Sequence, residues 1–102
     1  MARGYWVGHV DVSDPDGYKQ YQAANAAAFR KYGGRFLVRA GASETPEGAT
    51  RSRHVVIEFP DYAAARDCYY SPEYQAALKK REGKSLIDLV LVEGYDGPQP
   101  TD

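Results

Sequence analysis

The sequence has little cysteine, no long apolar run and no excess of charge of either sign. The single Cys68 cannot form an internal disulfide, which agrees with a reducing cytoplasm. No apolar run approaches the ~18 residues that a membrane span needs. Residues 1–4 lead directly into strand-like sequence, so we expect no signal peptide. Thirteen basic residues against fourteen acidic ones argue against nucleic-acid or anionic-membrane partners, and we expect a cytoplasmic protein.

Several motifs that carry chemistry are also missing. There is no glycine-rich phosphate loop after a strand and no Gly-x-Ser-x-Gly segment, which argues against nucleotide binding and serine hydrolysis. The two histidines, His9 and His54, have no cysteine pair beside them, so we expect no metal site. Cys68 lacks a nucleophile signature and is interpreted as a small packed apolar residue. We expect no cofactor.

The composition is that of one ordinary globular domain. The chain has 102 residues, of which 43% are hydrophobic and 26% charged. This length suits one domain over residues 1–102. The last residues, about 95–102, are rich in proline and glycine and are expected to form a loose tail.

Hydrophobic periodicity predicts four strands and two helical segments. Period-two, β-branched stretches predict the strands, and apolar residues at helical spacing predict the helices. The expected strands are 5–12, 35–42, 54–59 and 86–93, and the expected helices are 15–32 and 61–82, the second restarting at 71–72. Asp14 is placed to cap the first helix and Gly33 to end it. The order βαββαβ is that of a ferredoxin-like α+β sandwich, with a four-stranded antiparallel sheet and helices on one face.

Strict alternation along the strands predicts one apolar and one mixed face of the sheet. The face expected to meet the helices carries Trp6, Val10, Val12, Phe36, Val38, Ala40, Val55, Ile57 and Phe59. The other face places apolar Val7, Leu37 and Val56 among charged residues. A monomer would leave those three in water, so we expect a homodimer through this face. The alternation of residues 86–93 does not decide which of their side chains face the helices.

Several segments resemble one family over nearly the whole chain. They are Tyr5-Trp6-Val7 with His9-Val10-Asp11-Val12, Gly33-Gly34-Arg35-Phe36-Leu37-Val38-Arg39, Ile57-Glu58-Phe59-Pro60, Tyr69-Tyr70-Ser71-Pro72-Glu73-Tyr74-Gln75 and Leu91-Val92-Glu93-Gly94. Together they resemble the domain of unknown function 1330 family, of the dimeric α/β-barrel superfamily. The resemblance implies a ferredoxin-like protomer whose sheet packs against that of a second copy. Relatives in the superfamily include cofactor-free monooxygenases, lactone isomerases and haem-dependent enzymes, but the family itself implies no activity. Ala40, where members often have glycine, and the Gly83-Lys84 break are departures from its pattern.

Three residues of the mixed face form the first candidate site. With strand order 4-1-3-2, His9, Arg39 and Glu58 lie on neighbouring strands and are expected to converge. Histidine is the usual proton carrier near neutral pH, and arginine can hold a carboxylate or enolate oxygen. The alternative is that these charges pair with one another across a dimer interface.

The first helix and the end of the second supply further candidates. Asn25 lies in an apolar stripe where its amide needs partners, and Tyr18 and Tyr21 could supply them or line a pocket. Arg81, on the inner side of its helix, either reaches a ligand anion or extends to the surface. Because aromatic residues are expected to fill the helix side, we place the cavity where the mixed face meets helix ends or the second copy.

Two hypotheses about function therefore stay open. The first is a cofactor-independent enzyme in which His9 is the acid or base, Arg39 polarises a substrate oxygen and Glu58 orients a neighbour. The second is a non-catalytic homodimer that binds a ligand or has a structural role. In either case the expected ligand is a small organic anion, because arginine is the residue available to hold it.

Overall fold

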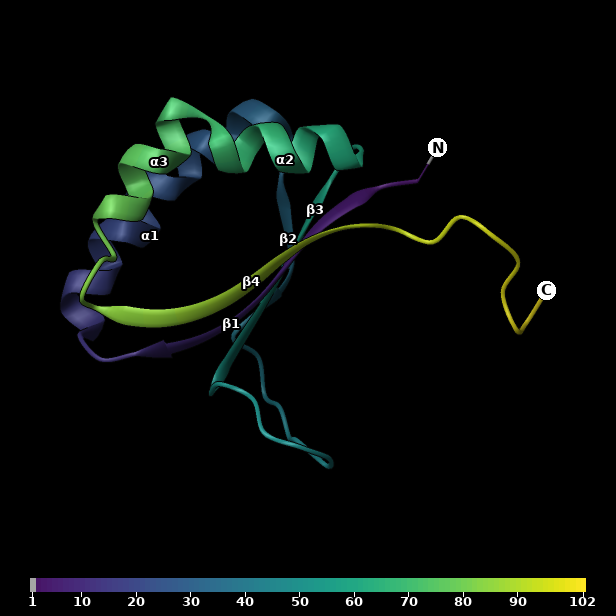
Figure 1. The fold of residues 1–102 in the computed structure, drawn as a ribbon, viewed down its shortest axis with the longest axis horizontal. Helices are drawn as coiled ribbons and strands as arrows, with labels where there is room; N and C mark the ends of the chain where they lie inside the picture. Colours follow the sequence, from purple (N-terminus) through teal and green to yellow (C-terminus); the bar gives the residue numbers. More distant parts are fainter. Residues whose placement is uncertain (1) are drawn as a thin grey trace.

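The chain folds into a four-stranded antiparallel sheet with three helices on one face (Figure 1). The computed structural model describes residues 2–102. In chain order the elements are β1 (Gly4–Val12), α1 (Pro15–Tyr32), β2 (Arg35–Arg39), β3 (Arg53–Phe59), α2 (Tyr62–Tyr70), α3 (Pro72–Lys79) and β4 (Ser85–Glu93). The strand order β2-β3-β1-β4 confirms the predicted ferredoxin-like arrangement. Among the described residues, no helix combines the length and apolarity needed to cross a membrane.

The helix boundaries follow from capping residues that the sequence predicted. The Asp14 side chain accepts a hydrogen bond from the Gly17 N–H at 3.0 Å, which satisfies one of the free donors at the start of α1. Gly33 ends α1 in the left-handed region at φ 77, where glycine has no steric penalty. Ser71 separates α2 from α3 and caps α3, since its Oγ accepts from the Tyr74 N–H at 3.1 Å.

An aromatic core joins the helices to the sheet. The ring of Trp6 of β1 meets the rings of Tyr74 of α3 and Phe29 of α1 edge-on. The distances between ring centres are 4.8 Å and 5.2 Å. The Trp6 indole N–H donates to the Ala65 carbonyl of α2 at 2.8 Å. Trp6 therefore contacts all three helices, and burying a large apolar side chain of this kind stabilises the fold by roughly 1.5–3 kcal/mol.

The structure settles the facing of β4, which the sequence left open. Ile87, Leu89 and Leu91 pack against the buried core, whereas Val90 and Val92 are 58% and 41% exposed on the other side. The side of the sheet away from the helices is called the open face below. It includes Val90 and Val92 of β4 and the residues that stand opposite them in β1, Val7 and Tyr5.

A β-bulge in β2 reverses the facing that simple alternation predicted. Phe36 pairs with Ile57, but the next pair along the strands is Val38 with Val56, so Leu37 is an extra residue in β2. Val38 therefore lies on the open face and Arg39 on the helix side, and the sequence-based assignment of both was wrong. The strand also ends at Arg39 instead of continuing to residue 42.

The bulge completes a row of four valines across the centre of the open face. Val38, Val56, Val7 and Val90 stand opposite one another on β2, β3, β1 and β4. The loop 40–52 after β2 extends away from the body, and residues 94–102 extend beyond the end of β4 without helix or strand (Figure 1). The predicted looseness of this tail stays a prediction.

Ala40, immediately after β2, is the one non-glycine among the described residues with positive φ, at 57. The left-handed region costs an L-residue about 1–2 kcal/mol, and the extra freedom of an unfolded glycine offsets part of that. We predict that Ala40→Gly raises the free energy of unfolding by ~1 kcal/mol in urea denaturation. Ala42→Gly, in the same loop without a positive φ, is the control and should give no gain. Equal effects of the two substitutions would contradict the left-handed conformation of Ala40.

Candidate functional site

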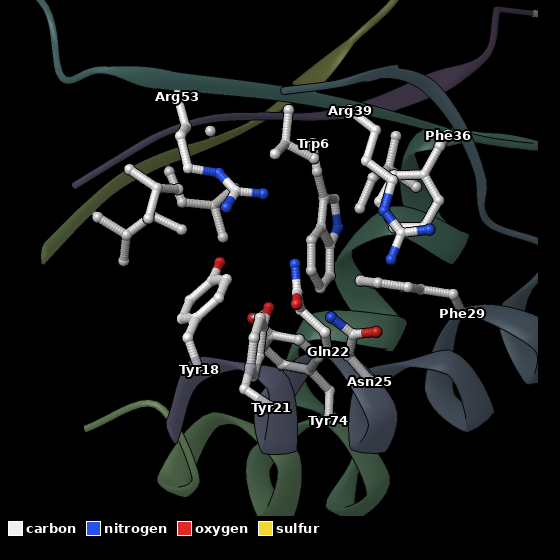
Figure 2. Close-up of a pocket in the computed structure, with 16 residues that line it drawn as sticks. Trp6, Tyr18, Tyr21, Gln22, Asn25, Phe29, Phe36, Arg39, Arg53 and Tyr74 are labelled. Atoms are coloured by element: carbon white, nitrogen blue, oxygen red, sulfur yellow. Dashed lines mark hydrogen bonds between the residues drawn. The ribbon is translucent and has the colours of Figure 1, made fainter. Parts of the chain in front are cut away.

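A cavity of about 50 Å³ lies between α1 and the helix side of the sheet (Figure 2). Its wall is largely apolar and aromatic, and polar groups reach it from both the sheet and the helix. The lining residues are Trp6, Gly8, Val10, Tyr18, Tyr21, Gln22, Asn25, Phe29, Phe36, Arg39, Arg53, Val55, Ile57, Tyr74, Ile87 and Leu89. A water molecule needs about 10–15 Å³, so the cavity holds more than one water-sized group.

Helix α1 supplies the polar groups on one side of the cavity. Tyr21 and Gln22 lie three and four residues after Tyr18, and Asn25 lies four and three residues after them, so all four share one helix face and point toward the sheet (Figure 2). The Asn25 side chain is 5% exposed and makes no hydrogen bond within residues 2–102. Burying an amide without a partner is unfavourable, so this group is available to a ligand or water in the cavity.

Two arginines approach the cavity from the sheet. Arg53 begins β3 opposite Val10, and its guanidinium lies 5.7 Å from the centre of the Tyr18 ring. Arg39 ends β2, and its guanidinium lies 4.3 Å from the centre of the Phe36 ring. Figure 2 shows both side chains extending from the strands toward α1. The bulge at Leu37 is what places Arg39 on this side.

Two hydrogen-bonded tyrosines line the cavity on the helix side, and a third arginine lies beside them. The hydroxyls of Tyr21 and Tyr74 are 2.7 Å apart, and the Arg81 guanidinium lies 5.4 Å from the centre of the Tyr21 ring. Burial and the neighbouring Tyr21 hold the pKa of Tyr74 far above its usual range, so this phenol stays neutral and can donate a hydrogen bond. Arg81 is 9% exposed, and its Nε has no hydrogen-bond partner among the described residues.

The electrostatic character of the cavity is cationic. Burial raises the pKa of the Tyr18 phenol, and nearby Tyr21 raises it further. Three positive charges oppose this rise, those of Arg53, Arg81 and Arg39. None of the three arginines has a carboxylate within ion-pair distance in the described part of the chain, and no carboxylate lines the cavity. The site therefore favours negative charge that the protein itself does not provide.

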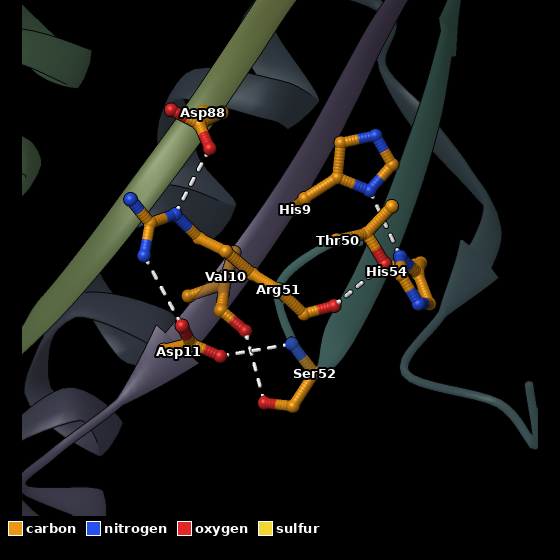
Figure 3. A network of polar contacts seen from close by, with 8 residues as sticks. All are labelled: His9, Val10, Asp11, Thr50, Arg51, Ser52, His54 and Asp88. Atoms are coloured by element: carbon orange, nitrogen blue, oxygen red, sulfur yellow. Dashed lines mark hydrogen bonds and ion pairs between the residues drawn. The ribbon is translucent and has the colours of Figure 1, made fainter. Parts of the chain in front are cut away.

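The predicted convergence of His9, Arg39 and Glu58 is wrong. The Nδ1 of His9 lies 2.8 Å from the Nδ1 of His54 on the open face (Figure 3). Glu58 accepts a hydrogen bond from the Tyr5 hydroxyl at 3.3 Å and stands four residues from His54, roughly 13 Å along β3. Arg39 is on the opposite side of the sheet because of the bulge. A prediction based on strand alternation could not foresee the extra residue.

The other predicted ligand residues do come together. Tyr18, Tyr21, Asn25 and Arg39 line the cavity, and Arg81 adjoins it. The cavity itself lies on the helix side, contrary to the expectation that aromatic side chains would fill that space. Whether these residues bind a ligand stays a prediction.

Sequence reasoning missed Arg53, Gln22 and Tyr74. Arg53 lies two residues before Val55 and shares its facing, but it was assigned to the loop because the strand was expected to begin at residue 54. Gln22 lies four residues after Tyr18 and three before Asn25, a helical spacing that could have revealed it. The contact between the hydroxyls of Tyr74 and Tyr21 joins residues 53 positions apart, which no local sequence pattern reveals.

The family model for a domain of unknown function, DUF1330, matches residues 3–95. The chain belongs to this family. No curated protein matches the sequence. Membership agrees with the resemblance seen in the sequence and with the ferredoxin-like fold of this DUF1330 protein.

Three solved structures show the same fold at low sequence identity. A protein of unknown function from Rhodopseudomonas palustris is 15% identical with a TM-score of 0.73, over 94% of this chain and 85% of that one. SnoaB, a cofactor-independent oxygenase from Streptomyces nogalater, is 19% identical with a TM-score of 0.64, over 98% and 99%. An ethyl tert-butyl ether D family protein from Bacillus halodurans is 15% identical with a TM-score of 0.52, over 95% and 100%. At these identities the likeness is one of fold.

The unpartnered Asn25 amide generates a test of the site's geometry. Asn25→Leu replaces the amide, which makes no hydrogen bond within residues 2–102, with a larger apolar side chain of the same branching that extends into the cavity. We predict that it raises the free energy of unfolding by ~1 kcal/mol, measured by urea denaturation. As a control, Tyr74→Phe removes one partner of a buried hydrogen bond and should lower stability by a similar amount. A loss of stability in Asn25→Leu would show that the amide is satisfied by the protein.

Proposed function

We propose that this DUF1330 protein binds a small organic anion in the cavity between α1 and the sheet. The observation that carries the proposal is the set of three arginines around it, none paired with a carboxylate in the described chain. Arg81 is nearly buried and Arg53 is half-buried, and cationic groups withdrawn from water normally have an anionic partner. Because the protein supplies none there, a ligand carboxylate or other oxyanion fits the site.

The wall of the cavity indicates what the rest of the ligand is like. Trp6, Phe29 and Phe36 present aromatic surface, which favours a flat apolar body over a purely inorganic ion. The hydroxyl of Tyr21 and the amide of Asn25 offer hydrogen bonds to further oxygens. We therefore favour a compact aromatic or unsaturated carboxylate, with guanidinium groups on its carboxylate and rings against its body.

Binding is better supported than acid–base catalysis. Neither a histidine nor a cysteine, aspartate or glutamate lies among the residues that line the cavity. The proposed acid or base, His9, and the proposed orienting group, Glu58, face the other side of the sheet. SnoaB is an oxygenase that works without a cofactor, but its likeness to this chain concerns the fold. An enzyme in this cavity would have to work through phenols, amides and guanidinium groups.

The binding proposal is tested with benzoate and its uncharged analogue benzamide. We predict that calorimetry detects benzoate binding and much weaker benzamide binding. Arg53→Ala and Arg39→Ala should each weaken benzoate binding about tenfold or more, because a hydrogen bond to a charged group contributes roughly 1.5–3 kcal/mol. Arg66→Ala, which removes an exposed arginine of α2, and His9→Asn should leave binding unchanged. Equal binding of the two compounds, or no effect of either cavity variant, would contradict the proposal.

We also propose that two copies pair through their open faces. The valine row at the centre of this face stays exposed in one chain, with Val90 58% and Val38 40% accessible. The flanking positions carry charges of both signs, such as Arg35 and Asp88. A two-fold interface needs a self-complementary surface, and an apolar centre with a mixed-charge border meets that need. The second copy therefore fits this face better than a partner of one charge sign.

Light scattering at micromolar concentration tests the dimer. We predict about twice the chain mass of 11.3 kDa for the native protein. Val90→Asp puts an unpaired carboxylate at the centre of the interface in both copies and should yield the monomer. Tyr70→Asp is the matched control, since Tyr70 is 65% exposed on α2, away from the open face. A native monomer, or a dimer that survives Val90→Asp, would overturn this arrangement.

A further inference from the structure

Both histidines of the protein stand on the open face, in a row two residues along the strands from the valine row. His9 of β1 stands directly opposite His54 of β3 and, on its other side, opposite Asp88 of β4. The two imidazole rings lie at 74° to each other with centres 5.1 Å apart, and their Nδ1 atoms are 2.8 Å apart. Both residues are half-buried and lie on the open face of the sheet.

Two imidazole nitrogens at this separation have a limited set of arrangements. As a hydrogen bond, the contact requires one ring to hold its proton on Nδ1 and the other to accept it. If both rings instead hold their protons on Nε2, two lone pairs point into the same small volume. A divalent transition-metal ion about 2.0–2.1 Å from each nitrogen in tetrahedral geometry needs the two nitrogens about 3.3 Å apart. A displacement of about half an ångström, within reach of small χ rotations, brings the Nδ1 atoms to that distance.

Carboxylates lie close to this pair and favour a cation. Asp11 and Asp88 are on the same face, and both are held by Arg51, at 3.1 Å and 3.0 Å (Figure 3). Asp11 also accepts the backbone N–H of Ser52 at 2.8 Å, and this bond is the main reason that its pKa is lowered. Both carboxylates are thus fixed in position, and two negative charges against one arginine leave a net negative charge beside the rings.

We propose that His9 and His54 together bind one divalent transition-metal ion through their Nδ1 atoms. Within residues 2–102 no three histidine, cysteine, aspartate or glutamate side chains form a ready ligand group, so the chain itself supplies two ligands. Water, or ligands from a second copy on the same face, would fill the other positions. The preferred ions are those that favour imidazole, namely Zn²⁺, Ni²⁺ and Cu²⁺. The site lies on the opposite side of the sheet from the anion cavity and does not depend on it.

The composition of the chain makes this proposal easy to test. His9 and His54 are its two histidines, and its one cysteine, Cys68, is buried, with burial raising the pKa of its thiol to about 12. Titration of the untagged full chain with Zn²⁺ near neutral pH should show binding of one ion per chain. His9→Gln and His54→Gln should each weaken binding about tenfold or more. Glu58→Gln, on the same face but remote from the rings, should leave it unchanged.

A second readout keeps the test independent of variant stability. The electron paramagnetic resonance spectrum of the Cu²⁺ complex should show coupling to two imidazole nitrogens in the native protein and to one in each variant. Thermal unfolding without metal shows whether the variants fold, and if they do not, the native spectrum decides the question. No Zn²⁺ binding by the native protein, an affinity unchanged in both histidine variants, or coupling to a single imidazole nitrogen would overturn the proposal.

Discussion

The extra residue in β2, Leu37, controls what each side of the sheet presents. In a regular strand that continued from the Phe36–Ile57 pair, Arg39 would stand opposite His54 on the open face, and Val38 opposite Val55 on the helix side. With the extra residue, Val38 completes an apolar row on the open face while Arg39 contributes a guanidinium to the cavity. A bulge changes facing at the cost of one unpaired residue, which is why bulges often occur beside functional sites. The anion cavity and the proposed dimer surface therefore depend on the same local irregularity.

The aromatic core explains how a chain of this size can contain a cationic cavity. Trp6 contacts all three helices and anchors them on the sheet, so the space beside it does not have to close around the arginines. Phenol hydroxyls and ring faces then surround the guanidinium groups: the Arg53 and Arg81 guanidinium groups lie within 6 Å of tyrosine ring centres. Such cation–π contacts stabilise a positive charge without neutralising it. The guanidinium groups can therefore stay charged in the folded protein when no anion is bound.

The sequence was sufficient for the fold and for part of the site. Caps at Asp14, Gly33 and Ser71 and the alternation of β1 were readable because they depend on neighbouring residues. Tyr18, Tyr21 and Asn25 of the cavity were likewise found from their helical spacing, whereas Gln22 was not. The facing of Arg39 was not, because a bulge depends on pairing with a distant strand, and the one local signal was Ala40 in a conformation that glycine prefers. The contact of His9 with His54 also arises only from strand register, which single-sequence reasoning did not supply.

The central claim is that arginine side chains converge on a cavity between α1 and the sheet. The most direct test is an NMR spectrum of the arginine Nε–Hε groups, recorded while benzoate is added. We expect the signals of Arg39, Arg53 and Arg81 to shift and saturate together, while those of Arg51 and Arg66 stay in place. Shifts confined to Arg51, which lies over the open face, or no saturable shift at all would contradict it.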